Sequence, residues 1–168
     1  MVREAQALAE KALGPHHAWL PPLYQKIAPL LDECGQQNEA EALLRDAWTF
    51  DQAKFPVNHP RLMNSALLYS ANLSERGRFP ESEAVLRELH DRYAKELPKD
   101  SWRAVVVGMR LGSILTAKRK FDESERLLTD ANATLVRSFD PSDAPVVESR
   151  ALLARLYRAW GKPEKAKP

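Results

Sequence analysis

Apolar residues recur along this chain at matching positions every 42 residues, and their spacing within each repeat is helical. Two columns of such residues stand four positions apart, and residues at this spacing lie on one face of an α-helix. The first column holds Ile27, Tyr69, Leu111 and Leu153, and the second holds Leu31, Leu73, Leu115 and Tyr157. A third column, in the segment that follows, holds Leu44, Leu86 and Leu128. We therefore expect two helices in each repeat, each with one buried face.

Small side chains mark the point where the two helices of each repeat cross. Helices approach closely only where a side chain is small. The first helices carry Ala28, Ser70, Gly112 and Ala154 in one column, and the second helices carry Ala40, Ser82, Ser124 and Ala166. The pattern predicts antiparallel hairpins with helices at residues 2–13, 17–34, 38–55, 60–76, 80–97, 101–118, 122–139 and 144–160.

A strict period of this length is typical of one supersecondary unit stacked on itself. We expect a single repeat domain over residues 1–168. It would contain a half unit at 1–14, whole units at 15–56, 57–98 and 99–140, and a partial unit at 141–168. Terminal units of such arrays need polar outer faces, so the two unfinished ends favour a piece of a longer protein.

The repeated phrase from Gly77 to Glu83, Gly-Arg-Phe-Pro-Glu-Ser-Glu, and the small and apolar columns resemble tetratricopeptide repeats (TPR). The match is to the 42-residue variety found in kinesin light chains and in many bacterial proteins, and it covers the whole chain. The resemblance implies an all-α fold, a right-handed α-solenoid of antiparallel helix hairpins whose first helices line a concave face. The stretch 153–166 is also similar to the closing repeat attached to some bacterial serine/threonine kinases.

The sequence departs from the family pattern in the column of the first-helix aromatic residue and at one turn glycine. The aromatic residue that often opens the first helix is present as Tyr24, whereas the matching positions hold Ala66, Gly108 and Arg150. Gly35 and Gly77 end first helices, where a left-handed residue is favoured, but Arg119 takes the matching place. Gly108 and Gly112 fall inside one helix, where each costs about 0.5–1 kcal/mol relative to alanine. We expect loose packing around these two glycines.

The resemblance also implies which residues face a ligand. On the first-helix face these are Asn64, Leu67, Ala71, Val106, Met109, Ser113, Arg155 and Arg158. An apolar centre made by Leu67, Val106 and Met109 suits an extended or helical peptide, and arginines at helical spacing suit an acidic ligand. Two alternatives stay open, since the apolar residues could pack inside the hairpins and the arginines could form a solvated charged face.

Composition narrows the classes of partner. The chain is 44% hydrophobic and 29% charged, with 25 basic and 23 acidic residues and a formal net charge of +2. Because the two signs interleave, a nucleic-acid partner is disfavoured. The apolar runs are too short for a membrane span, and the N-terminus lacks the apolar core of a signal peptide. A single cysteine, Cys34, excludes an internal disulfide and fits a reducing compartment, so we expect a cytoplasmic protein.

No grouping of residues predicts catalysis. The Glu-x-Glu pairs that begin at Glu39, Glu81 and Glu123 recur with the repeat, in the first turn of the second helix, where negative charge favours the helix dipole. The four histidines lack the carboxylate or thiol partners of a metal site. We therefore expect no enzymatic activity, no cofactor and no bound metal.

Our leading hypothesis is a non-catalytic interaction module that binds a peptide or protein on its concave first-helix face. The second hypothesis is a self-associating scaffold, a homodimer formed through the incomplete terminal repeats, whose apolar edges include Val2, Leu8 and Leu156. The third is a regulatory C-terminal TPR segment of a larger signalling enzyme, such as a bacterial serine/threonine kinase.

Overall fold

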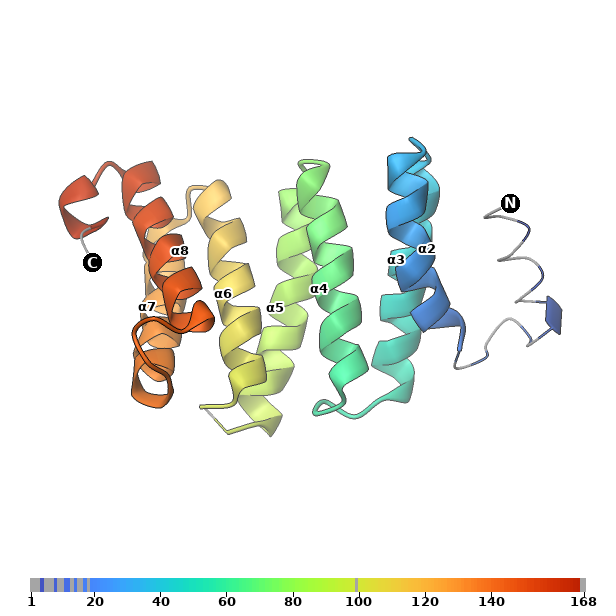
Figure 1. The fold of residues 1–168 in the computed structure, drawn as a ribbon, viewed down its shortest axis with the longest axis horizontal. Helices are drawn as coiled ribbons and strands as arrows, with labels where there is room; N and C mark the ends of the chain where they lie inside the picture. Colours follow the sequence, from blue (N-terminus) through green and yellow to red (C-terminus); the bar gives the residue numbers. More distant parts are fainter. Residues whose placement is uncertain are drawn as a thin grey trace. The chain divides into compact units, whose positions relative to one another are not determined.

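The computed structural model describes residues 4, 8, 11, 12, 14, 17, 19–98 and 100–166. The chain divides into two compact units, Met1–Arg76 and Gly77–Pro168. This boundary falls inside the repeat predicted for residues 57–98, so each unit contains helices from adjacent repeats. All regular structure in the described ranges is helical, as Figure 1 shows.

The first unit contains α2 (Leu20–Glu33), α3 (Gln37–Lys54) and α4 (Pro60–Glu75). Helix α3 packs against both α2 and α4. The core includes Leu31 of α2, Leu44 of α3 and Leu73 of α4, all of which are buried. A buried ion pair joins the end of α3 to the start of α4, since Arg61 Nη2 lies 3.0 Å from Oδ1 of the fully buried Asp51.

The second unit contains α5 (Phe79–Glu96), α6 (Trp102–Ala117), α7 (Phe121–Ser138), α8 (Ala144–Trp160) and the short 3₁₀ helix η1 (Pro163–Ala166). Helix α6 contacts α5, α7 and α8, and η1 packs against α8. The hydrophobic core of this unit joins Leu128 and Leu135 of α7 to Leu156 and Tyr157 of α8. Because α6 has neighbours on most sides, nine of its residues are buried.

The observed helices agree with those predicted from the sequence to within three residues at every end from α2 to α8. The helix predicted at residues 2–13 lies mostly outside the described residues. The predicted domain and repeat boundaries stay a prediction, because nothing in the packing of the two units tests them.

The first helices end in the same left-handed turn, including the one that lacks glycine. Gly35 has φ 76° and Gly161 has φ 74°, and Arg119 takes φ 60° at the matching position. In each of these turns the amide of the next residue donates a hydrogen bond to a carbonyl oxygen in the last turn of the helix. Lys120 N, for example, donates to Leu115 O at 2.9 Å. This bond defines a Schellman motif. Helix α6 thus keeps its C-terminal cap although Arg119 must adopt a φ that glycine adopts more easily.

The predicted crossing of small residues is observed between α6 and α7. The Ser124 hydroxyl donates to the carbonyl oxygen of Gly112 at 2.7 Å and lies 2.8 Å from the Thr116 hydroxyl. A Cβ atom built on Gly112 would lie 2.8 Å from Leu128 Cγ. Packing around Gly112 is therefore tight, and the expectation of loose packing there was wrong because Leu128 occupies the vacant side-chain space.

A glutamate of each second helix pairs with a cation that follows in the next repeat. The pairs are Glu41 with Arg76 in the first unit, and Glu83 with Lys118 and Glu125 with Lys165 in the second unit. These glutamates are the second members of the predicted Glu-x-Glu pairs. They therefore join a second helix to the segment at the end of the next first helix, a role beyond the predicted effect on the helix dipole.

Glu83 has the densest of these charge contacts. Its carboxylate accepts hydrogen bonds from Lys118 at 2.6 Å, Lys120 at 2.8 Å and Arg87 at 2.8 Å. Burial alone would raise the pKa of Glu83, but these three donors outweigh burial and lower the pKa from 4.5 to about 2. The carboxylate thus ties α5 to the connection between α6 and α7.

The two glycines of α6 predict opposite effects of the same substitution. Gly112→Ala should lower the free energy of unfolding by about 1–3 kcal/mol, because the new methyl group would overlap the buried Leu128 side chain. Gly108→Ala is the matched control, since its Cβ would lie 3.7 Å from the His90 ring, an ordinary contact. Alanine's higher helix propensity should then raise stability by about 0.5–1 kcal/mol. Urea unfolding of both variants checks this, and equal effects would contradict it.

Glu83→Gln should lower the free energy of unfolding by about 1–3 kcal/mol at neutral pH, because glutamine cannot provide a charged acceptor for three cations. Since folding lowers the pKa of Glu83, the carboxylate stabilises the fold fully above about pH 4.5, and this contribution is lost as the pH falls towards about 2. Urea unfolding at a series of pH values should show the difference from wild type shrinking on acidification. Glu96→Gln, at the exposed end of α5, is the control, and a pH-independent difference for Glu83→Gln would contradict the assignment.

Candidate functional site

The residues predicted to face a ligand fall into separate sets in the two units. Asn64, Leu67 and Ala71 lie on α4 in the first unit. Val106, Met109 and Ser113 lie on α6, and Arg155 and Arg158 lie on α8, in the second unit. Each set belongs to its own unit.

In the first unit, polar side chains join the two first helices. The Asn64 amide donates to Gln25 Oε1 of α2 at 2.6 Å, and the Asn72 amide donates to Asp32 Oδ2 at 2.9 Å. Ala71 is exposed and Leu67 is half-buried. The predicted polar contact residue Asn64 is exposed but already holds α4 to α2, so part of its hydrogen-bonding capacity is used within the fold.

In the second unit, Met109 lies in the core and away from the predicted ligand-facing surface. Its side chain is 4% exposed and packs in the cluster that contains Leu128, Leu135 and Leu156. For Met109 the alternative interpretation, packing within the helices, is therefore the correct one. Val106 and Ser113 are half-buried and remain accessible at the surface of α6.

Two arginines on α8 form an exposed pair. Arg155 and Arg158 lie three residues apart, so their side chains share one face of the helix. Within the described ranges neither is in an ion pair. Nearby, Arg110 of α6 and Glu148 of α8 form an exposed ion pair at 3.0 Å. Helix α8 therefore presents two exposed cations on one side.

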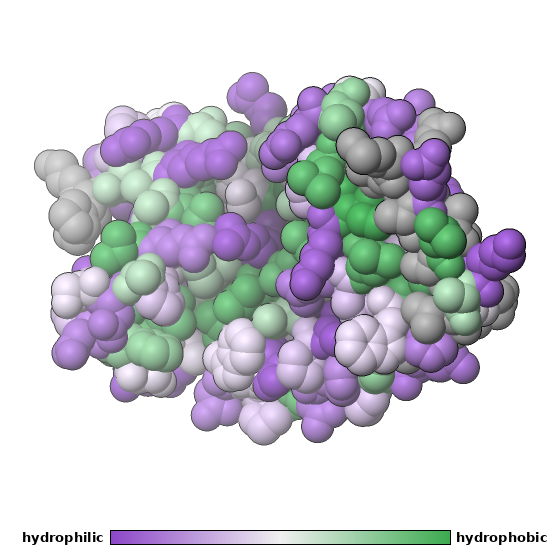
Figure 2. Space-filling model, turned by 45° about the vertical axis from the view of Figure 1, so that its right-hand side comes forward, coloured by the Kyte–Doolittle hydropathy of each residue, from purple (hydrophilic) through white to green (hydrophobic). Residues whose placement is uncertain are grey.

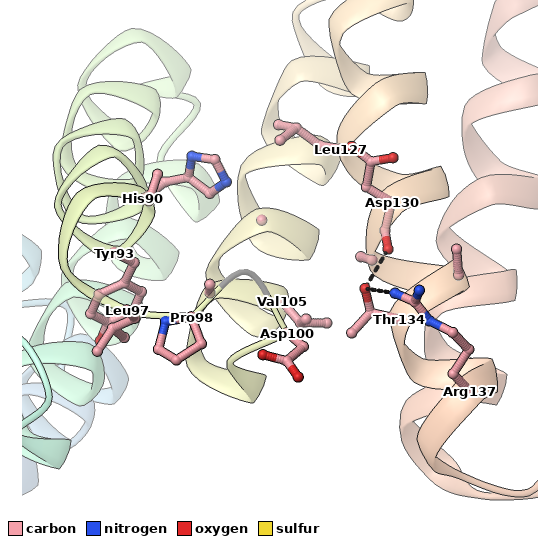
Figure 3. Close-up of a pocket in the computed structure, with 15 residues that line it drawn as sticks. His90, Tyr93, Leu97, Pro98, Asp100, Val105, Leu127, Asp130, Thr134 and Arg137 are labelled. Atoms are coloured by element: carbon pink, nitrogen blue, oxygen red, sulfur yellow. Dashed lines mark hydrogen bonds between the residues drawn. The ribbon is translucent and has the colours of Figure 1, made fainter.

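A groove that sequence reasoning did not assign lies in the second unit, between α5 and α7 (Figure 3). Its volume is about 810 Å³. His90 and Leu97 line it on the α5 side, Leu127 and Asp130 on the α7 side, and Val105 and Gly108 of α6 between them. The sequence signal for it was Gly108, which stands where another repeat has Tyr24. The expectation of loose packing around Gly108 agrees with this groove.

The other predicted features are only partly visible. Leu156, predicted as an uncovered apolar edge, is fully buried, whereas Leu8 is exposed and Val2 lies outside the described residues. Among the described side chains, no group of three or more His, Cys, Asp or Glu residues could hold a metal ion. Over the same residues, no helix combines the length and the apolar character needed to cross a membrane. Charged and apolar side chains interleave on the face drawn in Figure 2.

Comparison with known proteins identifies the fold. Neither a family model nor a curated protein matches the sequence. Two crystal structures of a Podosopora anserina putative kinesin light chain with nearly identical TPR-like repeats match with TM-scores of 0.83 and 0.81 and 21% identity, covering 98% of this chain and 78% of that chain. BtubC (BKLC) from P. vanneervenii matches with a TM-score of 0.74 and 18% identity, over 98% of this chain and 68% of that chain.

At these identities the likeness establishes the fold alone. The predicted fold class, an all-α solenoid of TPR-type helix pairs like those of kinesin light chains, is confirmed.

The placement of α6 side chains predicts different costs for two neighbouring truncations. Met109→Ala should lower the free energy of unfolding by about 2–4 kcal/mol, because it leaves a cavity in the core beside Leu128. Val106→Ala should cost less than about 1 kcal/mol, because Val106 is half-buried. Thermal and urea unfolding measure both. A larger cost for Val106→Ala than for Met109→Ala would mean that α6 is rotated relative to its placement here.

Proposed function

We propose that this chain is a non-catalytic protein-interaction module, and that the first-helix face of its second unit, formed by α6 and α8, binds an acidic segment of a partner protein. The observation that carries the proposal is the exposed pair Arg155 and Arg158, which has no carboxylate partner among the described residues. Exposed cations at helical spacing on the face that TPR folds offer to ligands are suited to carboxylates.

The chemistry of arginine favours this ligand class. A guanidinium group presents its N–H donors in a planar fork that matches a carboxylate, and such charge-assisted hydrogen bonds are stronger than neutral ones. Side chains three residues apart on a helix are neighbours, so Arg155 and Arg158 can contact successive acidic groups. Glu148 faces Arg110 nearby, and this exposed pair is open to exchange with an incoming carboxylate.

The uncharged part of the same face provides further contacts. Val106 and Ser113 of α6 are half-buried, so they offer partial apolar area and a hydroxyl group to a ligand without leaving the fold. Met109 does not take part, because it is buried. In the first unit, Asn64, Leu67 and Ala71 form a smaller polar and apolar surface, and we keep these residues as ligand contacts of that unit.

The proposal is tested with a fluorescent peptide rich in Glu and Asp that contains no large apolar residue, together with its Lys-substituted twin. The wild-type chain should bind the acidic peptide in preference to the basic one at this face. Arg155→Gln with Arg158→Gln should weaken binding of the acidic peptide about tenfold, because two charge-assisted contacts are lost. Raising the salt concentration should weaken wild-type binding, since exposed charges are screened.

The matched control is Arg126→Gln with Lys54→Gln, which makes the same change of charge at exposed positions elsewhere. Fluorescence anisotropy measures the affinities, and circular dichroism verifies that each variant keeps its helices. If the control pair weakened the acidic peptide as much as the Arg155 and Arg158 pair, binding would depend on overall charge, and the proposed face would be wrong.

A further inference from the structure

The groove between α5 and α7 exists because residue 108 has no side chain. A Cβ atom built on Gly108 would meet only the His90 ring, with Cδ2 and Nε2 each at 3.7 Å. The matching positions in the first unit hold Tyr24 and Ala66, and both side chains are buried. The groove volume of about 810 Å³ lies within the range of about 300–1,000 Å³ that is typical of ligand sites.

A buried tyrosine on the α5 side of the groove lacks a hydrogen-bond partner. Tyr93 lines the groove below His90 in Figure 3, its side chain is 0% exposed, and its hydroxyl has no partner in the described part of the chain. Burial raises the pKa of Tyr93 to about 12, so the hydroxyl stays protonated and is a donor. Buried polar groups are normally hydrogen-bonded. Because Tyr93 is fully buried, its hydroxyl lies below the surface of the groove.

The same register in the first unit shows how such a site is satisfied within the fold. There Asp51 takes the place of Tyr93, and it forms a buried ion pair with Arg61 of the next helix. In the second unit the matching arginine is Arg103, whose Nε is likewise buried without a hydrogen-bond partner. The second unit has thus lost an internal pair at the position where it gained a groove.

Two carboxylates at the border of the groove are in no ion pair within the described ranges. They belong to Asp100 and Asp130, which are exposed lining residues. Arg137 also lines the groove and keeps its positive charge, because the Thr134 hydroxyl to which it donates at 3.3 Å is neutral. Two carboxylates against one guanidinium group leave the charge of the lining negative.

We propose that this groove binds a short segment of a partner protein in which a large apolar side chain lies beside a lysine or arginine. The apolar side chain occupies the space over Gly108, against Val105 and Leu127. The cationic group pairs with Asp100 or Asp130, and its alkyl stem lies along the apolar lining.

This site is distinct from the first-helix face described above. Val106 lies on that face, and Gly108 follows two residues later, roughly 200° around the helix. The two surfaces therefore lie on different sides of α6 and carry opposite free charges. A partner of the groove is basic, whereas a partner of the first-helix face is acidic, so each site has its own probe.

The test uses the full chain, labelled with a fluorophore on the exposed Cys34, and an array of short synthetic peptides. One set pairs Leu, Met, Phe or Trp with Lys or Arg, and a second set replaces the basic residue with Glu. In the Arg155→Gln with Arg158→Gln background, which removes binding of acidic peptides at the first-helix face, the basic set should bind at least about fivefold more tightly than the Glu set in solution competition. Asp100→Asn with Asp130→Asn should weaken binding of that set about tenfold. Arg155→Gln with Arg158→Gln should leave it unchanged.

Two further variants define the site. Asp122→Asn with Asp140→Asn makes the same charge change at exposed positions outside the groove and should leave binding unchanged. Gly108→Met fills the base of the groove and should abolish the preference for large apolar side chains while the chain melts as the wild type does. If Gly108→Met fails to fold, the proposal is tested by comparing the Asp100 and Asp130 variant with the Asp122 and Asp140 control. No preference for the basic set, or equal weakening by both aspartate pairs, would overturn the proposal.

Discussion

The close approach of α6 and α7 at Gly112 is the constraint on which the second unit depends. Leu128 fills the space that a side chain at position 112 would need, and the Ser124 hydroxyl bonds to the Gly112 carbonyl oxygen. Protein interiors are packed as densely as organic crystals, so a methyl group there has no free volume to enter. This contact sets the distance between α6 and α7, and it thereby places the α7 side of the groove relative to its base.

Charge contacts fix the same helices in a second way. The glutamate column of Glu41, Glu83 and Glu125 pairs in every case with a cation of the following repeat, within one unit. Apolar contacts allow one helix to slide along its axis relative to another. A buried carboxylate with several donors does not, because moving a donor away leaves the carboxylate desolvated and unpaired. Glu83 has three such donors. The register of α5 against the start of α7 is therefore held by hydrogen bonds as well as by shape.

The elements and their crossings could be predicted from the sequence because they rest on local, periodic signals. The small columns at positions 112 and 124 and the turn residues Gly35 and Arg119 took their predicted places. The direction in which the Met109 side chain faces could not be predicted. Helix α6 carries apolar residues on most of its circumference, so the sequence pattern does not show which side of the helix faces the core. The groove is formed by side chains from three helices around Gly108, which has no side chain. Of these features, only the glycine could be recognised in the sequence.

A repeat protein can change one position in one repeat with few consequences elsewhere, because each repeat contacts only its neighbours. Position 108 illustrates this freedom, since Tyr24, Ala66 and Arg150 occupy the same column in the other repeats. Position 112 does not have this freedom. Its column holds only small residues, because α6 crosses α7 at this point. The variation at position 108 falls beside this crossing, and it shapes the groove. In this chain, the departures at Gly108 and Tyr93 coincide on one such groove, which is where we expect function to have diverged from the repeat.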